Sequence, residues 1–306
     1  MGIPGLVRRA VDRVRRGDDE ALSEVLYEIY AGAWRRTGWH VPRGTNIYDL
    51  EWDALLLLDA CRVDLLEEVR PEHDFLGPVG SIRSVGSMSE EWMRKTFTAE
   101  YEDQMADTAY VTANVFTNEV LDPADFAVLD EVWRYGWEDE AGTVPPRPVT
   151  ERAIDVAREA DYDRLIVHYM QPHHPFITTD FGEEIGADPF GREGHTTEVD
   201  ALRKGLISLA EFWTAYRANL DHVLEEVELL LSNLDAERVV VSSDHGDAVG
   251  EWGIYDHPAG FLHPSVTDVP WSVTTAEDRG TFEPALEPSD EADSDVEERL
   301  KRLGYL

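Results

Sequence analysis

Carboxylate and imidazole side chains recur in this sequence directly after short apolar runs. Asp59, His173 and the pair Asp244-His245 each follow such a run, and six of the ten histidines lie at these places or shortly after the last of them. Carboxylate oxygens and neutral imidazole nitrogens are ligands for one or two divalent cations, and a cation there can polarise a phosphoryl or sulfuryl oxygen. A single Asp often caps a helix and a single His is often structural, but the whole set predicts a metal site.

The apolar runs have the character of strands that are buried on both faces. The first of them, in WDALLLLDAC, shows no alternation of apolar and polar residues, which is typical of a strand in a parallel sheet. In an open parallel sheet, ligands bind beyond the carboxyl ends of the strands, where these acidic and histidine residues stand. Five such strands are expected, at residues 52–61, 109–113, 165–170, 239–242 and 271–274.

Helical patterns precede and separate these strands. The longest has apolar residues at three-to-four spacing along one face, as expected of an amphipathic helix. Strand and helix alternate along the chain, which predicts an α/β fold with a doubly wound, mostly parallel sheet and helices on both faces. The expected helices cover about residues 5–16, 19–36, 89–97, 123–135, 150–160 and 206–234.

One domain is expected to span residues 1–306, because the sequence contains neither an internal repeat nor a long linker. Three parts are peripheral to it. Residues 1–48 are expected to form an N-terminal helical extension. Residues 176–198 are expected to form an active-site loop, since this stretch is rich in glycine and acidic residues and has no periodic pattern. Residues 281–306 read as an acidic tail followed by a C-terminal helix.

The charge of the chain is strongly negative. The sequence has 27 basic and 63 acidic side chains, a net charge of −36, and only three of the basic residues are lysines. Such a surface repels phosphate backbones and anionic lipids, so nucleic-acid binding is not expected. The composition resembles that of halophilic archaeal proteins, whose self-repulsion is screened by concentrated salt. No run approaches the roughly 20 apolar residues of a membrane span and no signal-peptide core is seen, which predicts a cytoplasmic protein without stable membrane insertion.

Four segments resemble motifs of one enzyme superfamily. VVVSSDHGDAVGEWGIYDHPAGFLHPSVTDVPW is similar to the Ser/Thr-Asp-His-Gly-Glu…Val-Pro segment of the alkaline phosphatase and sulfatase superfamily. DALLLLDACRVD resembles the opening metal-aspartate strand of its sulfatase-like branch, HYMQPHHPF the His-x-Pro segment, and VEERLKRLGYL the Leu-Gly-Tyr ending. The matches run in the family's order from about residue 50 to the end. The resemblance implies an alkaline-phosphatase-like fold, of a haloarchaeal type, and metal-dependent chemistry on phosphate or sulfate esters.

The resemblance also implies a set of ligands for a divalent metal ion such as Zn²⁺, Ca²⁺, Mg²⁺ or Mn²⁺. Asp59, Asp244 and His245 would bind one cation beside the nucleophile. His173 and His257 would bind a second cation or the anionic oxygens of the ester. These five positions form the expected metal centre.

The nucleophile is where the sequence departs from the sulfatase pattern. Sulfatases carry Cys-x-Pro-Ser-Arg, whereas Cys61 stands in Cys-Arg-Val-Asp, only two residues after Asp59. In the phosphatase-like branches the nucleophile is a serine or threonine at the start of the helix after the first strand, a place that Ser89 or Ser87 fits. A helix N-terminus favours an alkoxide or ester anion, although either serine could equally be a helix cap. Ser89 is the first choice.

Two readings of the remaining residues stay open. Arg62 could hold the oxyanion of the substrate bidentately or be a structural arginine. Gln171 stands where an acidic ligand would be useful, which favours one well-formed cation site over two. The sequence predicts a hydrolase or transferase that acts on phosphate or sulfate esters, such as glycan- or lipid-linked ones, through a covalent serine intermediate. The alternatives are a phosphodiesterase-type metallohydrolase and a non-catalytic binding module.

Overall fold

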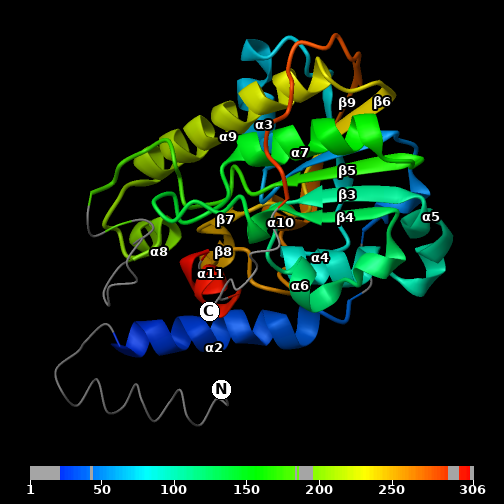
Figure 1. Cartoon of the computed structure of the whole chain (residues 1–306). Helices are drawn as coiled ribbons and strands as arrows, with labels where there is room; N and C mark the ends of the chain where they lie inside the picture. The colour runs from blue at the N-terminus through cyan, green and yellow to red at the C-terminus, as the bar shows by residue number, and fades with distance from the viewer. Residues whose placement is uncertain (1–20, 42–43, 183–184, 186–195, 289–295, 304–306) are drawn as a thin grey trace.

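The computed structural model describes residues 21–41, 44–182, 185, 196–288 and 296–303. These residues form one seven-stranded sheet and the helices around it (Figure 1). The strand order is β2-β9-β6-β1-β5-β3-β4, and a separate pair of short strands, β7 and β8, forms a hairpin. The strands are β1 Ala54–Leu58, β2 Val79–Arg83, β3 Thr108–Thr112, β4 Val128–Glu131, β5 Arg164–Tyr169, β6 Ala236–Ser242, β7 Ala248–Val249, β8 Tyr255–Asp256 and β9 Asp268–Ala276.

β1 lies at the centre of the sheet and runs parallel to β5 on one side and β6 on the other. All five of its residues are buried, because helices cover both faces of the sheet there. β3 and β4 extend the parallel part beyond β5, whereas β9 runs antiparallel to both β6 and β2. The carboxyl ends of β6, β1, β5 and β3 therefore open on the same edge of the sheet, as a parallel arrangement requires.

Helices cover the two faces of the sheet in separate groups. α7 and α9 lie on one face with α3, and α4 and α6 lie on the other (Figure 1). α9 begins with a capping box, in which the Ser208 hydroxyl accepts from the backbone N–H of Glu211 and the Glu211 carboxylate accepts from the backbone N–H of Ser208. The helices are α2 Ala21–Gly38, α3 Val63–Val69, α4 Ser89–Thr96, α5 Glu102–Ala106, α6 Thr117–Val120, α7 Pro146–Glu159, α8 Glu198–Arg203, α9 Leu209–Leu231, α10 Pro264–Thr267 and α11 Val296–Arg302.

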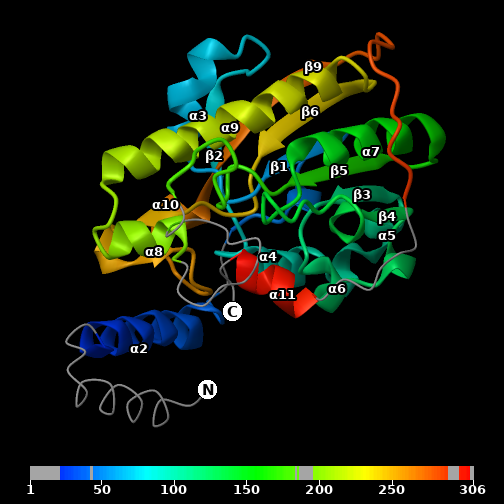
Figure 2. The same cartoon turned by 60° about the vertical axis from the view of Figure 1, so that its left-hand side comes forward.

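Helix α2 lies apart from the sheet and packs against the segment that contains the β7–β8 hairpin (Figure 2). The Trp34 ring stacks on the Trp252 ring at 5.8 Å and meets the Phe261 ring edge-on at 5.3 Å. The Tyr27 hydroxyl donates to the carbonyl of Tyr255 at 2.9 Å. These contacts attach the N-terminal extension to the main body of the fold.

The five strands expected from the sequence are all present, but one expected helix is wrong. Residues 123–135 form a 3-10 turn at Pro123–Asp125, strand β4, and a second 3-10 turn at Val132–Arg134. β4 pairs with β3 along the edge of the sheet, and this tertiary pairing overrides the helical spacing of the apolar residues. β2 and the β7–β8 hairpin were not anticipated, because their runs are short and only partly apolar.

Several other expectations are met in part or lie outside the described residues. The long helix begins at Leu209, not near residue 206, and α8 precedes it as a separate helix. The expected helix at 5–16 lies outside the described residues, as do most of the loop at 176–198 and part of the tail at 281–295. Among the described helices, none combines the length and the apolar character that crossing a membrane would require.

The charge of −36 leads to a prediction about salt. We expect the melting temperature to fall when the protein is moved from molar KCl to dilute buffer, because the like charges then repel one another without screening. Differential scanning calorimetry across a KCl series, with net charge held constant by fixed pH, measures this. An equal or higher melting temperature in dilute buffer would contradict the halophilic interpretation.

Candidate metal centre and active site

Asp59, Asp244 and His245 meet at the carboxyl edge of the sheet, as the strand-end argument predicts. Asp59 follows β1, and Asp244 and His245 follow the neighbouring strand β6. One potential ligand atom from each of the three residues lies within 4.8 Å of the other two, and all three side chains are buried. His245 Nε2 is 3.4 Å from Asp59 Oδ1 and 3.4 Å from Asp244 Oδ2.

The hydrogen bonding of this group fits a bound cation. Asp59 Oδ1 and Asp244 Oδ2 are both buried and have no hydrogen-bond partner among the described residues, although buried carboxylate oxygens are almost always paired. The second oxygen of Asp59 accepts from Asn114 Nδ2 at 2.9 Å and from the Ser89 hydroxyl at 3.2 Å. The oxygens left without partners belong to the side chains that could hold a cation, so the residues present fit a divalent metal ion.

The backbone holds these ligands through contacts between β1 and β6. The Ser243 hydroxyl donates to the carbonyl of Leu58 at 2.6 Å and accepts from the N–H of Cys61 at 3.0 Å, which ties the ends of the two strands together. Ala60, directly after Asp59, has a φ of 60°, a left-handed conformation that is uncommon outside glycine. Such strain in a turn is maintained when the surrounding contacts determine the conformation.

Burial controls the protonation of the group. Burial raises the pKa of Asp59 well above its ordinary value, and the charge of Asp244 raises it further. Burial opposes the charged form of Asp244 as well, but His245 and His168 outweigh it and lower the pKa of this carboxyl. Burial also lowers the pKa of the His245 imidazole. Two buried carboxyl groups beside buried imidazoles form an environment that a divalent cation would stabilise.

Ser89 is the first residue of α4, and its side chain reaches this group. Its hydroxyl oxygen is 3.2 Å from Asp59 Oδ2 and 3.3 Å from His245 Nε2. The preceding residue, Met88, occupies the N-cap position and does not cap the helix through its side chain, so Ser89 stands at the N-terminus of α4. The structure thus brings Ser89 to the group, where the hydroxyl, two carboxylates and an imidazole converge.

Ser87 makes a different set of contacts. Its hydroxyl donates to Glu91 Oε2 at 2.8 Å and accepts from the backbone N–H of Gly260 at 2.8 Å. The same carboxylate accepts from the backbone N–H of Ser87 at 2.9 Å. These bonds fasten the start of α4 to the segment after His257. They differ from the helix cap considered from the sequence, because Met88 holds the N-cap position and makes no side-chain cap.

A second group lies next to the first and contains His173, Asp256 and His257. Potential ligand atoms from these three residues also lie within 4.8 Å of one another. The ring centroid of His257 is 4.9 Å from that of His173 and 4.4 Å from that of His245, so His257 contacts a residue of each group and the two groups are adjacent. Asp256 supplies the carboxylate that the sequence did not place, and this observation favours two cation sites where Gln171 had favoured one.

In the second group, the pKa values of His257 and His173 are shifted in opposite directions. Burial would lower the pKa of His257, but the carboxylates of Asp256 and Asp247 outweigh it and raise the pKa. His257 Nδ1 is 2.6 Å from Asp256 Oδ1. Burial and the neighbouring His174 lower the pKa of His173 well below its ordinary value. Asp256 also has a φ of 68°, which places its backbone in the left-handed region.

His168 and Asn114 complete the first group and were not assigned a role from the sequence. His168 Nε2 is buried and, within the described part of the chain, has no hydrogen-bond partner; it is 3.8 Å from Asp59 Oδ2 and 3.7 Å from Asp244 Oδ2. Its Nδ1 is 2.8 Å from the hydroxyl of Tyr110. His168 lies inside β5, and only the pleat of the strand shows that its side chain faces α4. Asn114 lies two residues beyond β3, so its place at the end of a strand was the available signal.

Arg62 is engaged with other protein groups. Its Nε and Nη2 donate to the two carboxylate oxygens of Asp64 at 2.9 and 2.8 Å. Its Nη1 donates to Glu251 Oε1 at 2.7 Å and to the carbonyl of Asp247 at 2.8 Å. These contacts occupy every nitrogen of the guanidinium group, so they favour the structural alternative for Arg62 over the oxyanion-binding one.

Arg62 therefore carries a prediction about stability. We expect Arg62→Met to lower the free energy of unfolding by about 2 kcal/mol, because it leaves a half-buried carboxylate and a buried carbonyl without their donor. Chemical denaturation measures the change, and the divalent-ion content of the folded variant should match that of the wild type. If Arg62→Met left the free energy of unfolding unchanged but abolished ester turnover, Arg62 would instead be assigned the oxyanion-binding role.

A mostly parallel seven-stranded sheet with helices on both faces makes this chain an α/β protein, with acidic and histidine groups at the carboxyl edge of the sheet. No family model matches the sequence, and no curated protein matches it. Solved structures do. The chain is similar to the soluble domain of lipooligosaccharide phosphoethanolamine transferase A from Neisseria meningitidis, with 15% identity over 73% of this chain and 76% of that one and a TM-score of 0.50.

Two further solved structures are similar at lower TM-scores. One is the C-terminal periplasmic domain of phosphoethanolamine transferase EptC from Campylobacter jejuni, with 15% identity over 72% of this chain and 77% of that one and a TM-score of 0.47. The other is a protein in the alkaline phosphatase superfamily from Vibrio parahaemolyticus, with 11% identity over 83% and 69% and a TM-score of 0.43. At 15% identity, the likeness to the Neisseria structure concerns the fold, and it agrees with the alkaline-phosphatase-like fold expected from the sequence.

Proposed function

We propose that this protein is a metal-dependent enzyme that cleaves or transfers a phosphate- or sulfate-ester group through a covalent intermediate on Ser89. The observation that carries the proposal is the position of the Ser89 hydroxyl at the start of α4, 3.2 Å from Asp59 Oδ2 and 3.3 Å from His245 Nε2. A hydroxyl in this place is next to the residues that fit a cation and at the positive end of a helix. Both features favour an oxygen nucleophile.

The proposed reaction has two displacement steps. Ser89 Oγ attacks phosphorus or sulfur in line, its proton passes to Asp59 Oδ2, and the bond to the alcohol oxygen breaks as the new ester bond forms. The departing alcohol oxygen takes up a proton from solvent. Water or an acceptor alcohol then attacks the same atom in line, from the side that the first alcohol left. Its proton passes to solvent, the bond to Ser89 Oγ breaks, and Asp59 Oδ2 returns the proton to this oxygen. Water gives hydrolysis and an alcohol gives group transfer.

The first group, Asp59, Asp244 and His245, would hold one divalent cation, and the second, His173, Asp256 and His257, would hold another. When bound, such cations supply Lewis acids that stabilise the alkoxide and the charge on the transferred group. Asn114 orients Asp59 through a hydrogen bond of 2.9 Å to Oδ2. Zn²⁺, Ca²⁺, Mg²⁺ and Mn²⁺ are all compatible with this mixture of oxygen and nitrogen ligands.

The test is turnover by the full chain loaded with each of these cations. The substrates are an aryl phosphate monoester, an aryl phosphodiester and an aryl sulfate, each with and without a simple acceptor alcohol. We expect release of the aryl alcohol from at least one of them and, after a rapid acid quench, a mass increase on the peptide that contains Ser89. Turnover of the diester alone would favour the phosphodiesterase-type alternative.

Two further properties belong to this proposal. Bound divalent ion without turnover of any ester would favour a binding module, and absence of bound ion after dialysis at native salt would favour it more strongly. The substrate is proposed to be an ester on a larger molecule, such as a glycan or a lipid. A lipooligosaccharide phosphoethanolamine transferase has a similar fold, which supports this proposal. A cytoplasmic location and a halophilic source stay predictions.

A further inference from the structure

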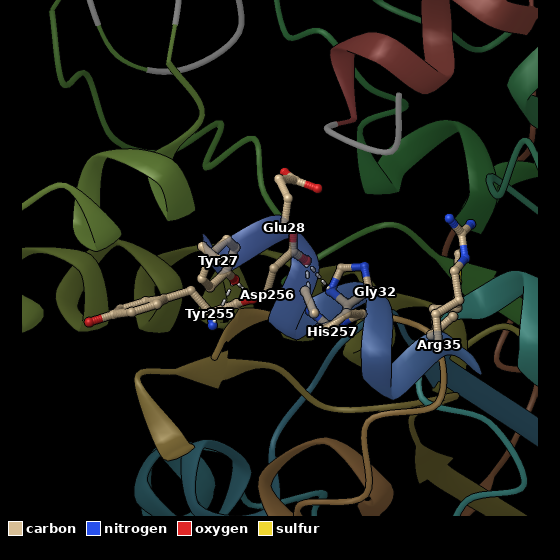
Figure 3. A pocket seen from close by; sticks show the side chains of 11 residues that line it. Tyr27, Glu28, Gly32, Arg35, Tyr255, Asp256 and His257 are labelled. Atoms are coloured by element: carbon tan, nitrogen blue, oxygen red, sulfur yellow. Dashed lines mark hydrogen bonds and ion pairs between the residues drawn. The ribbon is translucent and has the colours of Figure 1, made fainter. Parts of the chain in front are cut away.

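A hollow of about 270 Å³ lies between α2 and the segment that carries the second group. Its lining includes Met88, the residue before Ser89, together with Asp256 and His257. One wall therefore contains the residue that precedes the proposed nucleophile, and another contains two residues of the second group. The opposite wall is α2, which comes from the N-terminal extension and contributes Glu28, Gly32 and Arg35 among others (Figure 3). We call this space the α2 hollow.

Helix α2 is fixed to the same segment that supplies Asp256 and His257. The Tyr27 hydroxyl donates to the carbonyl of Tyr255 and accepts from its N–H, at 2.9 and 3.1 Å. At the other end of the helix, a Cβ on Gly38 would lie 1.7 Å from the carbonyl oxygen of Gly260, so the two backbones are in close contact. These two contacts fix the position of α2 relative to Asp256 and His257.

Gly32 keeps the middle of this wall open. A Cβ built on Gly32 would meet no atom within 4 Å, although glycine weakens the interior of a helix relative to alanine. Figure 3 shows Gly32 between Glu28 and Arg35, with His257 next to it. The absence of a side chain at this position leaves space directly over a residue of the second group.

Arg35 stands at one end of the α2 hollow. Within the part of the chain that the structure describes, its guanidinium group makes no hydrogen bond or ion pair. Other described arginines, such as Arg62, Arg152 and Arg203, have one or more carboxylate partners. In a chain with 63 acidic residues, an arginine without a partner beside the site is available to an anion.

We propose that the α2 hollow binds the alcohol portion of the ester and that Arg35 binds an anionic group on that portion, a phosphate, sulfate or carboxylate. The substrate class is thus an ester with a second negative charge, placed away from the reacting group. The inference rests on the proposed function, because it names the substrate of the same site. Glu28, on the other side of Gly32, represents the competing possibility, a substrate whose alcohol portion is cationic.

The test compares two esters that differ by one carboxylate. The metal-loaded full chain is assayed with phenyl phosphate and 4-carboxyphenyl phosphate, and with the two corresponding sulfates. We expect kcat/KM to be about tenfold higher for the carboxylated ester, the size of one charge-assisted hydrogen bond, and we expect Arg35→Gln to remove this preference. Arg36→Gln is the matched control, since it removes the same charge from the next residue on α2, which does not line the hollow.

A steric variant tests the space itself. Gly32→Leu should lower kcat/KM for both esters without loss of bound metal, because its side chain enters the hollow. Gly32→Ala controls for the helix and should raise the melting temperature. Unchanged turnover in a folded Gly32→Leu protein would overturn the proposal. The role of Arg35 would also be contradicted if Arg36→Gln removed the preference for the carboxylated ester as fully as Arg35→Gln does. A preference for an ammonium-bearing phenyl ester that Glu28→Gln removes would show that the hollow binds a cationic alcohol portion instead.

Binding measurements separate this inference from the proposed function. Calorimetric titration of the metal-loaded protein with 4-phosphonobenzoate and phenylphosphonate needs no turnover. Tighter binding of 4-phosphonobenzoate that depends on Arg35 but not on Arg36 would support the inference even if no ester were cleaved. Turnover without any preference for the carboxylated ester would leave the proposed function standing and contradict the role of Arg35.

Discussion

Asp244→Ala and His245→Ala are each expected to remove tight binding of a divalent cation and to reduce ester turnover by more than about a hundredfold. Both side chains are fully buried, and each supplies one of the three potential ligand atoms of the first group. Loss of either leaves two ligands, Asp59 among them, which is too few for a site closed by protein side chains. Metal content after dialysis, measured by inductively coupled plasma mass spectrometry, checks the first effect.

The control is His222→Ala. His222 is a histidine of α9, and it lies outside both groups of potential ligands. It should keep the metal content and turnover of the wild type, so that any loss in His245→Ala is due to position and not to the removal of an imidazole. Metal stoichiometry equal to the wild type in both Asp244→Ala and His245→Ala would show that the first group is not a cation site.

The first group could be predicted from sequence because its main residues follow strands. An apolar run without alternation predicts a buried parallel strand, and the residue after it must lie at the carboxyl edge. Asp59 is the first residue after β1, and Asp244 and His245 stand just beyond Ser243, the first residue after β6. His168 does not follow a strand, because it lies within one, and whether it faces α4 or α7 depends on the pleat. Its contribution becomes visible only when Trp92 of α4 is found against its ring, at 5.9 Å.

The second group was harder to foresee because its residues come from irregular backbone. Asp256 ends a two-residue strand and has a left-handed φ of 68°, a conformation for which a non-glycine sequence has no clear signal. Its pairing with His257 and His173 depends on how the β7–β8 hairpin folds back over the sheet edge. Tertiary contacts of this kind, including those with α2, are long-range and leave little trace in local patterns.

A similar limit explains the wrong helix at residues 123–135. Asp130 in β4 accepts from Arg152 Nε at 2.8 Å, a buried pair that joins the edge strand to α7. The strand also pairs with β3 through its backbone. Neither partner is near in sequence, so the local spacing of apolar residues pointed to a helix while the distant partners stabilised a strand.

Ser89→Ala is expected to reduce turnover by about a thousandfold or more while the protein keeps its fold and its bound metal. The substitution removes the one hydroxyl that lies within hydrogen-bond distance of both Asp59 and His245 among the described side chains. No potential cation ligand of the two groups is changed, so metal binding should persist. Turnover of the preferred aryl ester and metal content, measured on the same preparation, separate the two effects. The covalent mass increase on the Ser89 peptide should disappear with the hydroxyl.

Ser87→Ala and Cys61→Ala decide between Ser89 and the other two candidate nucleophiles. Ser87→Ala should lower stability by about 1–3 kcal/mol, since it takes a hydrogen bond from the buried Glu91 carboxylate, and should reduce turnover far less than Ser89→Ala.

Cys61 is fully buried, and burial raises the pKa of its thiol, which disfavours the reactive thiolate. Cys61→Ala should therefore lower stability by about 1 kcal/mol and remain active. Mass spectrometry should find an unmodified cysteine at this position. Normal turnover in Ser89→Ala with none in Ser87→Ala would move the nucleophile by two residues along the same helix start. Activity lost only in Cys61→Ala would refute the serine mechanism and return the chemistry to the thiol or to a residue made from it.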